Sequence, residues 1–221
     1  LNQINDWRVS LSNYLYVNHK KYQSLEILND VVQDFINQIV FLRICEDRNL
    51  PVYHKLIETI DDELSMKHQL NELFQNADRR YNSGLFREYS VIFDLDNKII
   101  IDIVMSLYYP KSPYLFNIFG PSLLGKVYEV FLTEQLVFSD DNKIVLAKKK
   151  ECLNRSVVTT PTEIAKYMVS KTLNSLCKDK NPDQILELRI ADIACGSGVF
   201  LEETFDFLVN YCIFPYYNLP S

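Results

Sequence analysis

The chain has 221 residues, of which 48% are hydrophobic and 24% charged. This composition is typical of folded globular proteins and argues against disorder. The formal net charge is −6 at pH 7; because dedicated nucleic-acid binders are usually basic, this charge argues against a large DNA-gripping surface on this chain alone. The sequence contains no apolar run of about 18 residues that would suggest a membrane span, and no signal peptide is visible at its start.

The first 138 residues follow helical periodicity. Residues 22–48 place apolar side chains at steps of three and four, which predicts one long helix, and Ser24 is its expected N-cap. Further helices are expected at about 5–16, 53–60 and 62–76, after the start signal at 94–97, and after Pro121. Residues 1–138 are therefore predicted to form an all-helical domain.

The character of the sequence changes near residue 139, where a second domain, 139–221, is predicted to begin. A turn at 140–142 precedes a short β-like run at 144–147. A basic cluster follows, made of Lys148, Lys149, Lys150 and Arg155. Such a cluster is usually a solvated linker, and a contact to DNA phosphates is the sharper alternative.

A new helix is expected after residue 160. Thr160 can cap it, Pro161 suits its first turn, and Glu163 completes a capping pattern. Its predicted apolar face contains Ile164, Met168 and Leu173. A polar loop, 178–184, then leads to a predicted strand at 188–194.

The predicted strand ends in a glycine turn that opens another helix, in the stretch "ADIACGSGVFL" at 191–201. Glycines at a strand-to-helix turn allow unusual φ angles and let the backbone approach a ligand closely. Gly196 and Gly198 match the first two glycines of the dinucleotide fingerprint, but Leu201 stands at the third position, and the Lys of a phosphate-binding loop is absent. The glycine backbone could instead approach a nucleoside that carries no diphosphate. Asp192, near the end of the predicted strand, could accept a hydrogen bond from an ammonium group. S-adenosylmethionine has that chemistry, and a purely structural corner is the alternative.

This stretch resembles the S-adenosylmethionine motif "DPACGSGxFL" of the amino-methylating, N6-adenine class of DNA methyltransferases. The matching residues are Asp192, Ala194, Cys195, Gly196, Ser197, Gly198, Phe200 and Leu201. Ile193 departs from the usual proline. The preceding "RSVVTTPTEIAKYMV" (155–169) is similar to the segment that packs beside the cofactor in the same class, with Thr160 and Pro161 in place and the usual aromatic residues missing.

The upstream segments "NQIVFLRICEDRNL", "YNSGLF" and "SPYLFNIFGPSLLGKVYEVFL" resemble the helical connector of type IIG restriction–modification enzymes. The resemblance implies a mainly α connector followed by the beginning of an α/β, Rossmann-like methyltransferase domain. It also implies S-adenosylmethionine as the cofactor and double-stranded DNA as the partner of the full-length protein. Mg²⁺ is expected only if a nuclease domain lies upstream.

No catalytic residue is expected within the chain. The class binds the flipped adenine with Asn/Asp-Pro-Pro-Tyr/Phe, and that motif does not occur here. We expect it beyond residue 221, and the start without methionine suggests a fragment. The connector also contains a charged cluster at the end of its long helix, made of Arg43, Glu46, Asp47 and Arg48. We interpret this cluster as an ion-pair network and not as a catalytic group.

The five cysteines are scattered, with no CxxC pair, and the three histidines lack ligand spacing. A disulfide framework and a zinc site are therefore not expected, and a reducing, cytoplasmic location fits. Two alternatives to a DNA methyltransferase stay open. One is a methyltransferase acting on RNA or protein, and the other is a non-enzymatic helical interaction module with a degenerate cofactor corner.

Overall fold

The computed structural model describes residues 2–50, 55–82, 84–86, 91–112, 125, 131, 133–149 and 160–217. The chain divides into two compact units, Leu1–Asn154 and Arg155–Ser221. This division falls after a short hairpin, whereas the predicted domain boundary at 138/139 falls between the two strands of that hairpin. The reason is that the hairpin packs on the helices of the first unit, as described below.

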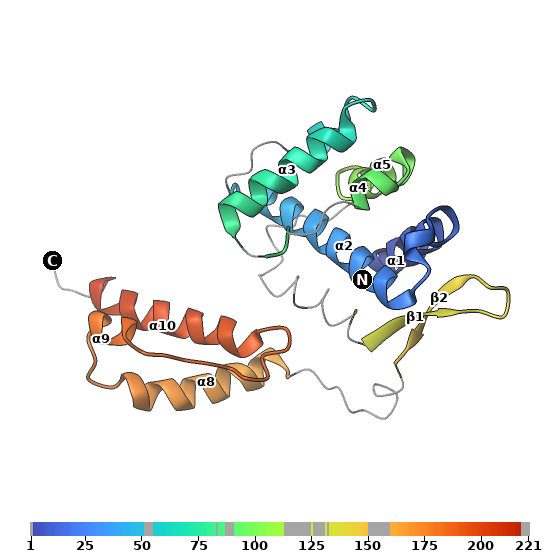
Figure 1. Ribbon diagram of the computed structural model, residues 1–221. Coiled ribbons are helices and arrows are strands. Elements are labelled where there is room, and N and C mark those ends of the chain that lie inside the picture. The colour runs from blue at the N-terminus through green and yellow to red at the C-terminus, as the bar shows by residue number, and fades with distance from the viewer. Residues whose placement is uncertain are drawn as a thin grey trace. The chain divides into compact units, whose positions relative to one another are not determined.

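The described part of the first unit is mostly helical, which agrees with the predicted helical region (Figure 1). Its helices are α1 (Asn2–Asn18), η1 (Lys20–Tyr22), α2 (Leu25–Asp47), η2 (Leu56–Ile60), α3 (Met66–Tyr81), α4 (Val91–Asp94) and α5 (Asn97–Met105). The predicted N-cap of α2 is confirmed, because the Ser24 side chain accepts from the backbone N–H of Ile27 at 3.4 Å. The helix expected after Pro121 falls largely outside the described residues, although Gly125 and Phe131 are helical.

One apolar core holds this unit together. Helix α2 contributes a stripe of buried side chains and packs along α1. The ring centroid of Phe74 of α3 lies 6.5 Å from that of Phe35 of α2 and 5.4 Å from that of Phe86. All three rings are buried. Buried aromatic rings of this size contribute much of the stabilisation that a helical core provides.

The charged cluster at the C-terminal end of α2 is a buried network. The Arg43 guanidinium lies over the Tyr108 ring, 4.2 Å from its centroid, and forms ion pairs with Glu46 and Asp47. Glu46 accepts from the Tyr108 hydroxyl and from the backbone N–H of Leu56. These contacts join α2, η2 and the segment that follows α5, so the predicted ion-pair role is confirmed for Arg43, Glu46 and Asp47.

A β-hairpin closes the first unit. Strand β1 (Glu134–Phe138) pairs antiparallel with β2 (Ile144–Lys148), with Leu136 opposite Leu146. The β-like run was predicted for β2 alone. The hairpin packs against α1, where the Asn13 amide donates to the Ile144 carbonyl at 2.8 Å and accepts from the Ile144 N–H at 2.9 Å.

A buried arginine fastens the other strand. The side chain of Arg8 is 1% exposed, and its guanidinium donates to the Glu134 carbonyl and to Asn29 of α2, both at 3.2 Å. It also lies 4.2 Å from the centroid of the Phe131 ring. Burial lowers the pKa of Arg8 to about 10, although the nearby Glu134 carboxylate acts in the opposite direction. At neutral pH Arg8 is still charged and joins α1, α2 and β1.

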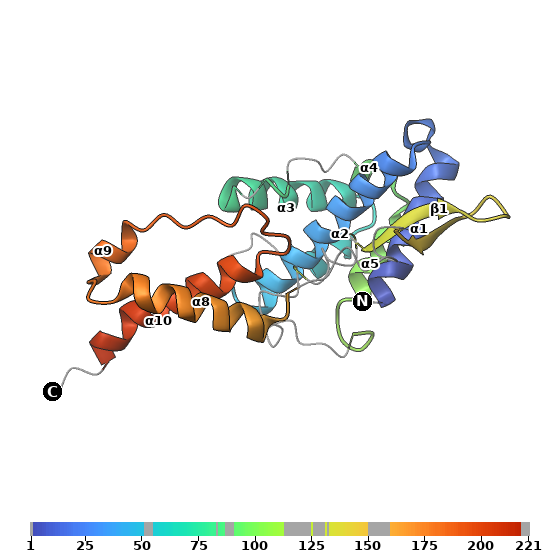
Figure 2. The same ribbon diagram turned by 90° about the horizontal axis from the view of Figure 1, so that it is seen from below.

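The described residues of the second unit, 160–217, form the helices α8 (Thr162–Cys177), α9 (Pro182–Leu186) and α10 (Val199–Tyr217). Helices α8 and α10 lie side by side (Figure 2). The small core between them consists of Val169, Leu173, Cys177 and Ile185, with partly buried residues of α10 packed against it.

One local prediction for this unit is wrong, and a second is not seen in the described residues. The polar loop at 178–184 contains the start of α9, capped by reciprocal hydrogen bonds between Asn181 and Gln184. The segment 188–194 is extended or turn-like and is not a paired strand. A parallel strand needs neighbouring strands for its hydrogen bonds, and the described residues of this unit offer none. The expected Rossmann-like start is therefore not seen here.

Candidate cofactor site

The glycine turn has the backbone that its sequence suggested. Gly196 and Gly198 have φ angles of +53° and +85°, a region that residues with a Cβ rarely adopt. The Gly198 N–H donates to the Cys195 carbonyl at 2.7 Å, and the Gly198 carbonyl accepts from Glu202 at 2.9 Å. The turn therefore delivers the chain directly into the first turn of α10.

The turn is also open. A Cβ added at Gly198 would meet no described atom within 4 Å, and one added at Gly196 would meet only the Ala194 carbonyl, at 4.0 Å. Ala194 and Cys195 are exposed, and Ser197 is half-buried. Backbone groups with open space above them can be approached closely by a ligand.

Asp192 is held in place just before the turn. Its Oδ1 accepts from the Ala194 N–H at 3.0 Å. Its Oδ2 is shielded from solvent and finds no hydrogen-bond partner among the described residues. Buried carboxylate oxygens are normally satisfied, so this atom has an unused capacity to accept a hydrogen bond from an ammonium or hydroxyl group.

The charge around the turn favours a cationic ligand over a phosphate. The N-terminus of a helix usually attracts anions. Here Asp192 precedes the turn and Glu202 lies in the first turn of α10, so two carboxylates already supply negative charge. The absence of the P-loop lysine from the sequence points the same way.

Thr160 and Pro161 lie at the start of α8, but not in the predicted capping arrangement. Pro161 is the N-cap, and no side-chain capping bond is present. The Pro161 carbonyl accepts from Ile164 at 2.9 Å and from Ala165 at 3.1 Å. Thr160 therefore precedes the cap by one residue, and the predicted capping role of its hydroxyl is wrong.

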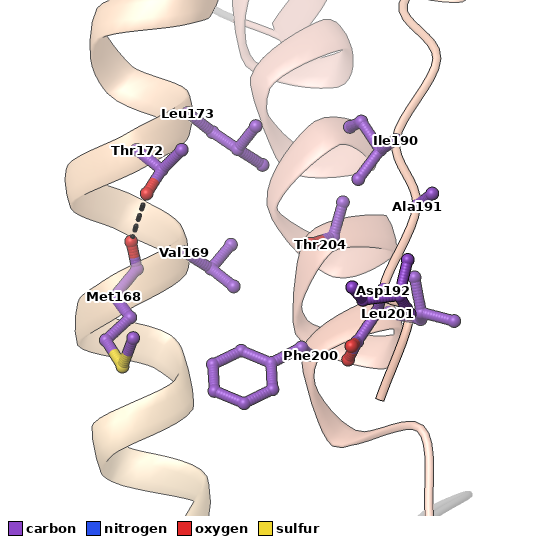
Figure 3. Close-up of a pocket in the computed structure, with 11 residues that line it drawn as sticks. Met168, Val169, Thr172, Leu173, Ile190, Ala191, Asp192, Phe200, Leu201 and Thr204 are labelled. Atoms are coloured by element: carbon purple, nitrogen blue, oxygen red, sulfur yellow. Dashed lines mark hydrogen bonds between the residues drawn. The ribbon is translucent and has the colours of Figure 1, made fainter. Parts of the chain in front are cut away.

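A pocket of about 320 Å³ lies between α8, the segment 190–193 and α10 (Figure 3). Of the predicted site residues, Asp192 and Phe200 line it, and Thr160, Pro161 and residues 194–198 do not. The other lining residues are Met168, Val169, Thr172, Leu173, Ile190, Ala191, Ile193, Leu201 and Thr204. The structure thus brings the carboxylate of the motif beside a mainly apolar cavity.

The α8 side of this pocket was only partly anticipated. The sequence grouped Ile164, Met168 and Leu173 as one buried face, but Ile164 and Met168 are about half exposed. The buried stripe is Ala165, Val169, Leu173 and Cys177, at four-residue spacing. The sequence contains both stripes, and the larger side chains of Ile164 and Met168 favoured the one that is not buried.

Among the described residues, no group of three or more His, Cys, Asp or Glu side chains is arranged to hold a metal ion. In the same part of the chain, every helix is too short or too polar to cross a membrane.

The chain is similar to one curated protein, the type II restriction enzyme and methyltransferase RM.Eco57I of Escherichia coli. The two are 41% identical over 215 residues, which is 96% of this chain and 21% of that protein. The chain therefore spans about one fifth of the length of its relative. No protein-family model matches the chain, and no solved structure matches it.

Proposed function

We propose that this chain is part of a restriction–modification enzyme that transfers a methyl group from S-adenosylmethionine to the N6 atom of adenine in double-stranded DNA. In this proposal residues 1–138 are the helical connector, and residues 139–221 begin the methyltransferase domain. The relative's name supports the methyltransferase and restriction–modification parts. The resemblance of 191–201 to the amino-methyltransferase motif supports the cofactor and adenine.

The observation that carries the cofactor proposal is the glycine turn beside an unsatisfied carboxylate. S-adenosylmethionine carries an α-ammonium group, a carboxylate and an adenosine, joined by a sulfonium centre that supplies the methyl group. The unpartnered Oδ2 of Asp192 suits a cationic donor such as the ammonium. The open backbone at Gly196 and Gly198 suits close approach by the rest of the ligand, and Phe200 at the pocket wall suits its apolar surface.

The residues of this chain bind and orient in this proposal, and they carry out no chemical step. Asp192 binds the ammonium group at the amino-acid end of S-adenosylmethionine. The glycine turn, with Ala194, Cys195 and Ser197, contacts the rest of the ligand. Pro161 is the N-cap of α8, the helix that carries some of the pocket-lining side chains, and Thr160, just before it, keeps the place that the motif gives it. The groups that bind the flipped adenine belong to the Asn/Asp-Pro-Pro-aromatic motif, which the 221 residues do not contain.

A chimera tests the proposal. The aligned region of RM.Eco57I is replaced by this chain, and transfer of labelled methyl from S-adenosylmethionine to duplex DNA is measured. We expect the chimera to methylate adenine and the Gly198→Val chimera to lose at least tenfold in cofactor affinity, measured by calorimetry. The valine is strained at φ +85° by about 1–2 kcal/mol and places methyl groups in the open space above the turn.

Gly198→Asn is the matched control, because asparagine tolerates positive φ better than valine does. If both variants fold, as judged by circular dichroism, and bind the cofactor as tightly as the unmodified chimera, the turn is not the cofactor site.

The same chimera distinguishes the alternatives. Methylation of RNA or protein in place of DNA would favour the first alternative. A folded chimera that binds no cofactor, beside an active RM.Eco57I control, would favour a helical interaction module with a degenerate corner. Localisation in the cytoplasm is part of the proposal, since its substrate would be there.

A further inference from the structure

Two of the cysteines belong to the small core of the second unit. Cys177 is the last residue of α8 and is completely buried, and Cys212 of α10 is partly buried and packs against the same apolar cluster. The side chain of Tyr211, the residue before Cys212, donates to the Cys177 carbonyl at 2.8 Å. This bond holds the C-terminal end of α8 to the turn of α10 that carries Cys212.

The electrostatics of Cys177 agree with this proximity. Burial raises the pKa of the Cys177 thiol, and the charge of a Cys212 thiolate raises it further. A charge effect of this kind acts between groups that are near each other. Both thiols are free in the structure, and neither lines the pocket beside Asp192.

We propose that Cys177 and Cys212 are a redox-responsive thiol pair. A low-molecular-weight disulfide, such as oxidised glutathione, converts the pair into a cross-link between α8 and α10. The partly exposed Cys212 thiolate attacks one sulfur of the oxidant and releases one thiol. The Cys177 thiolate then attacks the Cys212 sulfur of the mixed disulfide and displaces the second thiol. One disulfide is consumed, one is formed, and the two protons of the cysteines leave on the two released thiols.

The cross-link would fix the two helices that line the candidate cofactor pocket. The loop that it closes runs from 177 to 212 and contains α9, the segment 188–194 and the glycine turn. Closing such a loop restricts the unfolded chain, so the oxidised unit should resist unfolding more than the reduced unit does. The thiol chemistry itself does not depend on the methyl-transfer proposal.

The test oxidises the 221-residue chain with oxidised glutathione under native conditions, blocks the remaining thiols, and maps the peptides by mass spectrometry without reduction. We expect one cross-linked peptide pair joining 177 to 212, with a mass lower by two hydrogens than the sum of its parts. Because the thiolate is the attacking species, the cross-link should form faster as the pH rises toward 9. It should revert with dithiothreitol.

Variants make the result specific. Cys212→Ser should abolish the cross-link and leave Cys177 unmodified, and Cys177→Ala should leave a stable glutathione adduct on Cys212. Cys195→Ser is the matched control, because Cys195 is exposed on the glycine turn and should not affect the cross-link. The proposal is overturned if wild-type Cys177 and Cys212 are both recovered as free thiols or separate adducts while Cys195 is fully oxidised, or if 212 pairs with another cysteine.

Discussion

The two units of this chain differ in the size of the apolar core that each one builds. The first unit buries a broad apolar core, and it pairs even its buried charges, such as Arg8 with Glu134 and Arg43 with Glu46 and Asp47. In the described part of the second unit the core cluster consists of four buried side chains. Both units expose some large apolar side chains, such as Leu64 at 94% in the first and Ile193 at 101% in the second, but those of the second unit surround a much smaller core.

The difference shows that helices and extended chain depend on their surroundings differently. A helix forms its backbone hydrogen bonds internally, so α8 and α10 persist with one apolar face partly uncovered. An extended segment such as 188–194 needs a partner for every backbone group. The second unit therefore keeps the helices expected of it, while its predicted strand is unpaired.

The most direct test of this difference truncates one buried side chain in the core of each unit. Phe74→Ala should lower the free energy of unfolding of the first unit by about 3–5 kcal/mol, because it removes a buried ring from a packed core. Leu173→Ala should cost only about 2 kcal/mol in the second unit, at the low end for a buried leucine, because so little surrounds it. Amide hydrogen exchange of the whole chain, read separately for each unit, gives both values.

The exposed Leu186 supplies the control for that experiment, since Leu186→Ala should change either value by less than about 0.5 kcal/mol. If Phe74→Ala and Leu173→Ala cost the same, the two units are equally well packed and the contrast drawn above is wrong.

A second prediction concerns the buried carboxyl of the first unit. Burial raises the pKa of Glu46 above its ordinary value of 4.5, although the hydrogen bonds from Leu56 and Tyr108 partly offset this effect. The folded state thus binds the Glu46 proton more tightly than the unfolded state. Its contribution to stability is complete below about pH 4.5 and is lost as pH rises through the folded pKa.

Glu46→Gln should remove that component of the pH dependence, measured as the free energy of unfolding between about pH 4 and 8. Tyr108→Phe is the companion variant. It removes a donor to Glu46, should cost about 1–3 kcal/mol, and should strengthen the fall in stability with rising pH. A glutamine variant that keeps the wild-type slope would mean that another group titrates.

The smallest effect is expected at the end of the hairpin. Lys148 is exposed, and the Lys149 backbone N–H donates to the Thr133 carbonyl at 3.0 Å, a bond that a side-chain change leaves intact. Lys148→Gln and Lys149→Gln should each change stability by less than about 0.5 kcal/mol. The salt dependence of DNA binding by the chimera should also stay the same if these lysines belong to a solvated linker.

Phosphate contacts would instead reduce the slope of log affinity against log salt by about 0.9 for each lysine. Lys143→Gln, in the hairpin turn, is the control for a general change in charge. Lys150 and Arg155, the rest of the predicted cluster, lie outside the described residues.

Local signals carried most of the successful predictions. The periodicity of α2 and the serine before it were sufficient to predict a long helix with its cap, and the Asp96 cap of α5 follows the same logic. Strand β1 was missed because "EQLVF" follows a helical pattern without a breaker. It becomes a strand through pairing with β2 and through Arg8, which lies 126 residues away.

The candidate site divides in the same way. The glycine turn depends on φ angles that few other residues adopt. The chain has only 5 glycines in 221 residues, so two of them one residue apart were enough to predict the turn. The burial pattern of α8 depends on which neighbours are present, and the sequence does not contain that information. The pocket residue Thr204 was missed because its role depends on how α10 faces α8.

The contact between Asn13 and Ile144 has a consequence for how sheets can grow in this protein. The asparagine amide occupies both backbone groups that Ile144 turns away from β1, as a neighbouring strand would. A side chain on a helix thereby blocks strand addition at this position and protects an edge that could otherwise recruit an extended segment. At Ile144 the outer edge of β2 is therefore already occupied by a side chain of the same unit.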